Sequence, residues 1–507
     1  MIQNMSFIAS NSLQTPSVSW SGLLPAIILA AAAILLLTIC SLTPIKITNQ
    51  QLTIYTCVAA VGSLVATIPL WLRVQDESRG PFSTISGAFG IDGFSLFVTM
   101  LLTVSVILVS CLAGVFLKSE DIEGPESYVL LLLSATGGII MAGANDFIIL
   151  FLGIEVLSIS AYVLAAMNLK RIQSQEAGLK YFVLGAFASG FLLYGIALLY
   201  GATGSTELTA IRNFLVDTEL TNDTLLLAGL ALIIVGFAFK VAAVPFHFWA
   251  PDVYQGAPTP FVAYMASAIK AAGFAAMLRV LYVTFGQYRA DWQPVIYGIA
   301  IATLLLGSLL AIVQTDLKRM LAYSSISHAG YLLVGTQAAS DQGVAAVLFY
   351  LATYAFMVIG SFAVISLNSG PAGTETDLNS VTGLANRKPM LAIAFTVFLL
   401  GQAGIPLTSG FFAKFYVIEA VIEEESFGLA IVAMLAAVIG AFLYLRILVK
   451  IWLTNQETVS EEGKMIVIPK QVSFVLTIAT IVTLFLGVWP EPLVEMVQRA
   501  VPVLMAS

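Results

Sequence analysis

The sequence predicts an all-α polytopic membrane protein of about 14 transmembrane helices, with two inverted five-helix repeats and discontinuous seventh and twelfth spans. Three observations predict it. The chain of 507 residues is 59% hydrophobic and only 10% charged, whereas a soluble domain carries about 25% charged residues. Apolar runs of about 20 residues, the length that spans a bilayer, follow one another with short connections. Two of these runs are broken by proline and glycine.

The apolar runs give the following predicted spans, in order: 20–41, 52–72, 93–117, 126–143, 146–168, 177–202, 224–248, 259–285, 294–314, 319–338, 343–368, 390–422 (interrupted), 426–453 and 470–490. The first 18 residues contain no lysine or arginine, whereas a signal peptide has a basic amino-terminal region. We therefore expect the first run to be a retained span.

The lysine and arginine residues of the connections predict the orientation, because inside loops are enriched in them. With both termini outside, the inside connections carry twelve: Lys46, Lys118, Lys170, Arg171, Lys318, Arg319, Arg387, Lys388, Arg446, Lys450, Lys464 and Lys470. The outside connections carry five: Arg73, Arg79, Arg212, Arg289 and Arg499. This bias also supports an even number of spans.

Several classes of function are disfavoured by what the chain lacks. A net charge of -7 without a basic run predicts no nucleic-acid partner. Three separate cysteines exclude a self-contained iron–sulfur or structural zinc site. Two histidines allow at most one bis-histidine haem, which we do not expect, and there is no phosphate-binding loop. We predict no cofactor bound by this chain itself.

The five basic residues outside the connections fall within apolar runs, and Glu155 of the fifth span joins them: Lys180, Lys240, Lys270, Arg279 and Lys414. A charge near the bilayer centre costs about 2.5–3.5 kcal/mol. Glu155, Lys240, Lys270 and Lys414 are predicted near mid-depth, so together they cost on the order of 10 kcal/mol. We expect these four to face the interior of the helix bundle. Arg279, near the outer end of its span, is predicted to be structural.

The stretch FKVAAVPFHFW (239–249) breaks the seventh span at Pro245. Proline lacks an amide donor and clashes with the carbonyl four residues earlier, here that of Val241. Freed carbonyls need donors inside a membrane, and Lys240 can donate to them or reach a carboxylate. The alternative is a simple kink with a lysine that extends toward the surface.

The stretch GQAGIPLTSGFFAKF (401–415) breaks the twelfth span, and Ala403-Gly404-Ile405-Pro406 parallels Ala242-Ala243-Val244-Pro245. The two spans run in opposite directions, and paired broken helices in inverted halves are typical of transporter repeats. We therefore predict four segments: 1–125 with three spans, repeats 126–285 and 294–453, and 454–507 with the last span.

Lysine suits proton transfer because burial lowers its pKa by several units, whereas arginine stays charged. Glu155, Lys240, Lys270 and Lys414 are predicted to form a lateral proton chain, with Glu155 as the countercharge of Lys240. His247 is either a relay or an interfacial anchor beside Trp249.

Two further residues keep alternatives. Lys180 serves either in proton uptake or relay, or simply extends to the surface. His328 is either a relay or a hydrogen-bonded core residue.

The chain resembles a known family in five stretches: GANDFIILFLGIEVLSISAYVLAA, EAGLKYFVLGAFASGFLLYG, GFAFKVAAVPFHFWAPDVYQGAPTPFVAYMASAIKAAGF, QTDLKRMLAYSSISHAGYLLVG and GQAGIPLTSGFFAKFYV. These look like the antiporter-like subunits of respiratory complex I (NDH-1, NADH-quinone oxidoreductase), most closely subunit N, called subunit 2 in mitochondria. The resemblance covers about residues 125–455.

The resemblance implies a proton-translocating, non-redox subunit coupled to quinone reduction elsewhere, with NADH, flavin, iron–sulfur clusters and quinone held by partner subunits. It implies a Glu155–Lys240 pair and relay positions at Lys180, Lys270 and Lys414. Its partners would be other membrane-arm subunits, in a lipid bilayer that is most simply the bacterial inner membrane.

Three alternatives stay open. A subunit of a multi-subunit cation/proton antiporter would share this fold and these charges. The second alternative is a structural subunit with a non-functional channel, but such a channel would not require four charged residues that are costly in a membrane. The third is an organic-solute symporter, which would need more polar residues in the broken helices.

Overall fold

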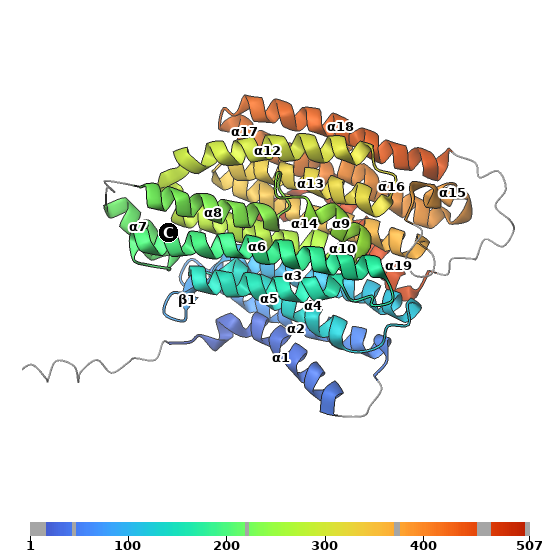
Figure 1. Cartoon of the computed structure of the whole chain (residues 1–507), viewed down its shortest axis with the longest axis horizontal. Helices are drawn as coiled ribbons and strands as arrows, with labels where there is room; N and C mark the ends of the chain where they lie inside the picture. Colours follow the sequence, from blue (N-terminus) through green and yellow to red (C-terminus); the bar gives the residue numbers. More distant parts are fainter. Residues whose placement is uncertain (1–16, 43–46, 219–222, 370–375, 454–467, 502–507) are drawn as a thin grey trace, which may run out of the picture.

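The computed structural model describes residues 17–42, 47–218, 223–369, 376–453 and 468–501, nearly all of them in helices that lie side by side (Figure 1). Lys46 and Lys464, counted above for orientation, and residues 1–16 lie outside the described residues. The helices are α1 (Trp20–Leu42), α2 (Asn49–Val74), α3 (Gly93–Ser119), α4 (Glu126–Gly143), α5 (Phe147–Ala165), α6 (Ile172–Thr203), α7 (Leu208–Asp217), α8 (Thr224–Lys240), α9 (Trp249–Gly256), α10 (Thr259–Tyr264), α11 (Lys270–Arg279), α12 (Arg289–Ile312), α13 (Leu317–Gln337), α14 (Asp341–Asn368), α15 (Leu384–Arg387), α16 (Pro389–Ala403), α17 (Ser409–Glu423), α18 (Phe427–Trp452), α19 (Lys470–Val488) and α20 (Glu491–Ala500).

Every predicted span corresponds to helix, and the chain is an all-α, multi-pass membrane protein. Among the described residues, eleven helical segments are long and apolar enough to cross a membrane. The other three predicted spans are α13 and the two broken ones, α8–α9 and α16–α17. The count of fourteen therefore stays a prediction, and so does the inverted repeat.

Helix ends coincide with capping residues. Asp92 and Ser95 form a reciprocal capping box at the start of α3, and Asp146 and Asp316 accept backbone N–H groups at the starts of α5 and α13. Gly204 ends α6 in the left-handed conformation that glycine adopts most readily.

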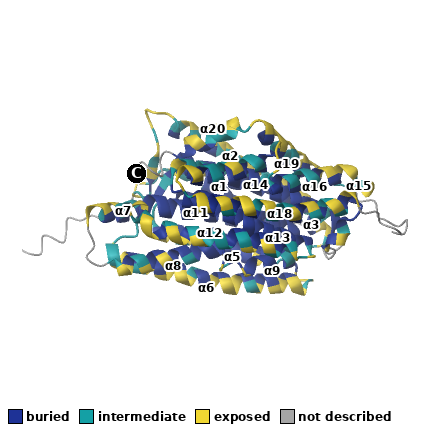
Figure 2. Cartoon of the chain, turned by 90° about the horizontal axis from the view of Figure 1, so that it is seen from above, coloured by how far each residue is buried: buried dark blue, intermediate teal, exposed yellow. Residues whose placement is uncertain are grey.

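Burial divides the helices into an inner and an outer group (Figure 2). In the most apolar 18-residue stretch of each helix, the share of buried residues is 100% for the segment Thr259–Thr284 and 94% for α14. It is 33% for α1, α2, α6 and α18. The outer helices expose large apolar side chains, as a lipid or subunit contact requires. The inner segments carry the polar residues described below.

Several short elements were not predicted. Strands β1 (Phe82–Thr84) and β2 (Phe89–Ile91) form an antiparallel hairpin that pairs Ser83 with Gly90, and α7 and α20 are short helices between or after spans. The segment Thr259–Thr284 also contains two π-helical turns, η1 (Met265–Ile269) and η2 (Val280–Thr284). Two 3₁₀ turns, η3 (Gly286–Tyr288) and η5 (Leu378–Val381), complete the elements.

Candidate functional site

The seventh span is interrupted between Lys240, the last residue of α8, and Trp249, the first of α9. The backbone groups that the break frees find partners from elsewhere. The Phe239 carbonyl accepts the Trp249 indole N–H at 3.0 Å, and the Val244 N–H donates to the Thr303 hydroxyl at 3.0 Å. The predicted discontinuity is present, but these two backbone groups bind Trp249 and Thr303 and not Lys240.

Lys240 lies inside the bundle with 7% of its surface exposed, and its ammonium donates to the Ser158 hydroxyl of α5 at 2.6 Å. Glu155, one turn earlier on α5, instead accepts the Ser189 hydroxyl of α6 at 2.5 Å. No ion pair between Glu155 and Lys240 is found in the part of the chain that the structure describes. Ser158 therefore binds Lys240 directly and lies one turn from Glu155 on α5.

The prediction that Glu155 faces the bundle interior is corrected, because its side chain is only half-buried. It lies between α5 and α6, whose outward faces expose Leu152 and Phe187. A carboxylate at this depth needs a polar partner, but the rotation of α5 about its own axis could not be predicted from the sequence. Ser189 supplies that partner near the outer surface of the chain.

The twelfth span is interrupted between α16 and α17, and here a lysine does bind the break. Gly404 ends α16 in the left-handed conformation (φ +85°). Lys414 of α17, 8% exposed, donates to the Ala403 carbonyl at 2.8 Å. The Lys414 ammonium also lies 4.9 Å from the centre of the Tyr331 ring, within cation–π range.

Lys270 occupies the most buried segment of the chain, directly after the π-helical turn η1. Its ammonium donates to both the carbonyl and the hydroxyl of Ser325 on α13. π-helical turns inside α-helices are often found at functional sites, because they redirect side chains. The turn places a buried cation against two neutral oxygens.

A cluster of aromatic side chains fills the space between Lys270 and Lys414. The Lys270 ammonium lies 5.8 Å from the Tyr354 ring centre, and the His328 and Tyr354 ring centres are 4.6 Å apart. His328 Nδ1 shares a hydrogen bond of 2.6 Å with the Tyr350 hydroxyl, and the Tyr331 and Tyr350 rings stack. Both lysines thus contact one connected aromatic cluster.

His328 has two hydrogen-bonding neighbours, since Nε2 also lies 3.1 Å from the Tyr444 hydroxyl. That hydroxyl is in turn 2.6 Å from the Ser324 hydroxyl. The expectation of a hydrogen-bonded core histidine describes this geometry, and a role as a relay stays a prediction.

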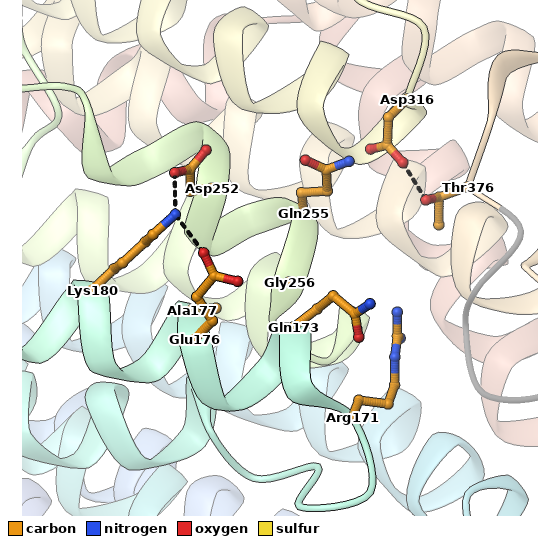
Figure 3. A pocket seen from close by; sticks show the side chains of 10 residues that line it. All are labelled: Arg171, Gln173, Glu176, Ala177, Lys180, Asp252, Gln255, Gly256, Asp316 and Thr376. Carbon is orange, nitrogen blue, oxygen red and sulfur yellow. Dashed lines mark hydrogen bonds and ion pairs between the residues drawn. The ribbon is translucent and has the colours of Figure 1, made fainter.

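Lys180 lies in a polar pocket of about 340 Å³ that α6 and α9 line together with Asp316, the N-cap residue of α13, and Thr376 (Figure 3). Its ammonium binds Glu176 at 2.7 Å and Asp252 at 2.8 Å, and 41% of its side chain is exposed. Arg319 binds the other oxygen of Asp252 at 2.6 Å. Lys180 therefore belongs to an ion network at the rim of the chain and not to the row of buried lysines.

His247 lies within the first break, 4% exposed, beside the Phe248 ring. Among the described residues, its Nδ1 has no hydrogen-bond partner. Within the described ranges, no hydrogen bond joins His247 to Lys240, so both predicted roles, relay and anchor, stay open.

Arg279 has the structural environment that was expected. It forms a buried ion pair with Asp92 at 2.7 Å and donates to the Ala142 carbonyl at 2.7 Å. These bonds join the end of α11 to the start of α3 and the end of α4.

Lys318 was missed by sequence reasoning, which placed it in an inside connection. The structure corrects this: Lys318 lies in the first turn of α13, is 1% exposed, and donates to the Ala257 carbonyl at 2.6 Å. Its neighbour Arg319 takes the surface position. Two adjacent basic residues look equivalent in sequence, although their side chains point in directions about 100° apart around a helix.

The tyrosines of the aromatic cluster were also missed, because aromatic residues in apolar helices carry no distinguishing signal. A search of the described residues finds no group of three or more His, Cys, Asp or Glu side chains placed to hold a metal ion.

Residues 144–440 match the family described as NADH:quinone oxidoreductase/Mrp antiporter, transmembrane. The chain is 39% identical to NADH-quinone oxidoreductase subunit N 3 of Streptomyces griseus, over 97% of this chain and 95% of that protein.

Two solved structures share the fold. A chain in the structure of respiratory complex I from Thermus thermophilus with bound aureothin is similar with a TM-score of 0.78 and 30% identity, covering 94% of this chain and 100% of that one. A chain of the Mrp complex from Dietzia sp. has a TM-score of 0.82 at 21% identity, covering 96% and 97%, which shows the fold alone.

Proposed function

The chain belongs to the subunit N family of NADH-quinone oxidoreductases, and we propose that it moves protons across an energy-transducing membrane as a subunit of such a complex. The observation that carries the proposal is a set of three buried lysines whose ammonium groups, among the described residues, bind neutral oxygens: Ser158 for Lys240, Ser325 for Lys270 and Ala403 for Lys414. A buried cation without a carboxylate partner loses its proton more readily than a paired one. Such groups are suited to pass protons on.

The path runs from the polar pocket through the interior to α17. Protons enter the chain at the pocket that holds Lys180, reach Lys240 and Lys270, and leave by way of Lys414. His328 and its tyrosine neighbours bridge Lys270 and Lys414. The hydroxyl groups of this cluster can both donate and accept hydrogen bonds.

Glu155 tunes Lys240 through Ser158. Glu155 lies one helical turn from Ser158, which accepts the Lys240 ammonium, so a change of charge at this carboxylate changes the electrostatic environment of Lys240. The half-buried position of Glu155 near the outer surface allows a neighbouring subunit to control that charge. This replaces the direct pair expected from the sequence.

The remaining parts of the proposal concern the surroundings. The chain itself performs no redox chemistry, and NADH, flavin, iron–sulfur clusters and quinone are bound by partner subunits. Other membrane-arm subunits cover part of its exterior. Residues 126–285 and 294–453 act as two inverted half-channels between the flanking segments 1–125 and 454–507. Both termini face outside, most simply across the bacterial inner membrane.

The subunits that co-purify with this chain distinguish the proposed function from that of a cation/proton antiporter. The complex is purified from native membranes through an affinity tag on this chain, and its subunits are identified by mass spectrometry. Flavin- and iron–sulfur-binding subunits in stoichiometric amounts support the oxidoreductase. Antiporter subunits alone would overturn it in favour of the second function.

A further inference from the structure

Lys318 lies directly behind the polar pocket. Gly256 forms part of the pocket lining, and the next residue, Ala257, provides the carbonyl that accepts the Lys318 ammonium at 2.6 Å. Lys318 is 1% exposed, so its charge is removed from bulk water. No ion pair of Lys318 is found within the described ranges, whereas Lys180 and Arg319 both bind the pocket residue Asp252.

Helix α13 also connects Lys318 to the environment of Lys270. Lys318 and Ser325 are seven residues apart on α13, which is about two turns and about 10 Å along one helix face. Ser325 is the residue that binds the Lys270 ammonium. Tyr254, 2% exposed, is buried in α9, the helix that also provides the pocket residues Asp252 and Gln255. Lys318 thus lies between the pocket and the environment of Lys270.

The position also permits a purely structural role. Ala257 is the carboxyl-terminal cap of α9, and a cation there is stabilising through the helix dipole. An arginine would serve that role equally well, because it retains the charge and the donors. It would not serve in proton transfer, because it does not release its proton in proteins. The two roles therefore predict different results for one substitution.

We propose that Lys318 is a proton-relay residue that connects the polar pocket to Lys270. As a neutral amine, Lys318 takes a proton from water in the pocket. As an ammonium, it passes a proton toward Ser325 and Lys270, and this transfer restores the neutral amine of Lys318. The inference rests on the proposed function and adds the uptake step to it.

The test measures NADH-driven proton transport in inverted membrane vesicles that contain the assembled complex, with Lys318→Arg and Lys318→Met. Transport is normalised to the amount of complex on native gels and compared with NADH oxidation. We expect both variants to lower coupled transport by about tenfold or more, the range of a lost proton-transfer group. Normal transport by Lys318→Arg would overturn the proposal and leave only the helix-capping role.

Lys170 provides the matched control. It lies on the same side of the chain and also donates to backbone carbonyls, those of Glu120 and Asp121, but it is 61% exposed. Lys170→Arg and Lys170→Met are expected to transport protons normally. A similar loss in these variants would overturn the proposal, because it would show that any lysine near this side affects transport.

Two further variants cover a failure of assembly and a failure of the proposed function. If Lys318→Arg does not assemble, Lys318→His and Lys318→Gln decide: the proposal requires transport to be better with the titratable histidine than with glutamine, and equal loss would overturn it. Lys270→Gln is measured in parallel. Normal transport by Lys270→Gln would contradict the proposed function as a whole, whereas normal transport by Lys318→Arg alone would contradict only this inference.

Discussion

At the scale of single residues, the chain separates two kinds of buried cation. Arg279 has a carboxylate at 2.7 Å and is fixed, whereas Lys240, Lys270 and Lys414 bind hydroxyl or carbonyl oxygens. Arginine cannot be deprotonated in a protein, but a buried lysine can. The residue type and its partner together indicate which cations hold the fold and which can carry a proton.

Loss of Arg279 should act on stability. Arg279→Gln leaves Asp92 buried without its cation, and breaking a buried ion pair costs about 3–5 kcal/mol. We expect a lower thermal midpoint of the purified complex and less assembled complex in membranes. Arg79→Gln, which removes an exposed pair with Asp76, is the control and should cost no more than about 1 kcal/mol. Equal effects of the two substitutions would contradict the distinction.

Loss of proton release at Lys270 should lower proton transport without affecting assembly of the complex. Lys270→Arg keeps a cation against Ser325 but removes a group that can give up its proton. We expect the complex to assemble while proton transport falls by about tenfold or more. The measurement is proton uptake by inverted vesicles on addition of NADH. Wild-type transport in this variant would show that proton release at Lys270 is not needed.

Sequence reasoning located the buried charges but not their partners. The cost of a charge in an apolar run is visible in composition alone, so Lys240, Lys270 and Lys414 could be predicted to be buried. The choice of Ser158 over Glu155 depends on the rotation of α5 and its distance from α8, which no pattern specifies. The burial of Lys318 was missed for the same reason.

At the scale of helices, the breaks in α8–α9 and α16–α17 organise the site. The sequence predicted both, because proline and glycine interrupt a long apolar run in recognisable ways. It did not predict which side chains bind the freed backbone groups. Tryptophan and threonine occur in many membrane helices, so nothing in the sequence marks Trp249 and Thr303 as these partners. The short hairpin and α7 were missed because they are connectors of only a few residues.

The packing of the second break should tolerate no added atom at Gly410. A Cβ there would lie 1.9 Å from the Gly401 carbonyl oxygen, so the backbones of α16 and α17 would have to move apart. Overpacking of this kind costs about 1–3 kcal/mol. We expect Gly410→Ala to lower both the thermal midpoint and proton transport, because the movement displaces Lys414 from Ala403.

Gly440 of α18 is the control for this substitution, since a Cβ there would have no atom within 4 Å. Gly440→Ala should leave both properties unchanged or raise stability slightly, because alanine favours helix. Equal loss in the two variants would show that close packing at the break is not the cause.

At the scale of the whole molecule, the inner segments carry the polar groups and the outer helices insulate them. The fully buried stretch around Lys270 lies between helices that expose apolar side chains to lipid or partner subunits (Figure 2). The sequence predicted this arrangement in outline, because charged residues in a membrane must be enclosed.

The predicted orientation can be tested by labelling. In a chain whose three cysteines are replaced by serine, Glu423→Cys should react with a membrane-impermeant maleimide in right-side-out vesicles. Lys170→Cys should react only after the membrane is opened. Both residues are exposed, so access decides the result. The reverse pattern would invert the orientation and place the polar pocket outside.

The central claim is that buried lysines of this chain carry protons, and Lys240→Ala tests it most directly. NADH-driven proton transport is measured in inverted vesicles with complex whose assembly is verified on native gels, next to Lys470→Ala at the exposed start of α19. Lys240→Ala is expected to assemble and to lose proton transport by about tenfold or more, while Lys470→Ala transports normally. Intact proton transport in assembled Lys240→Ala complex would contradict the account.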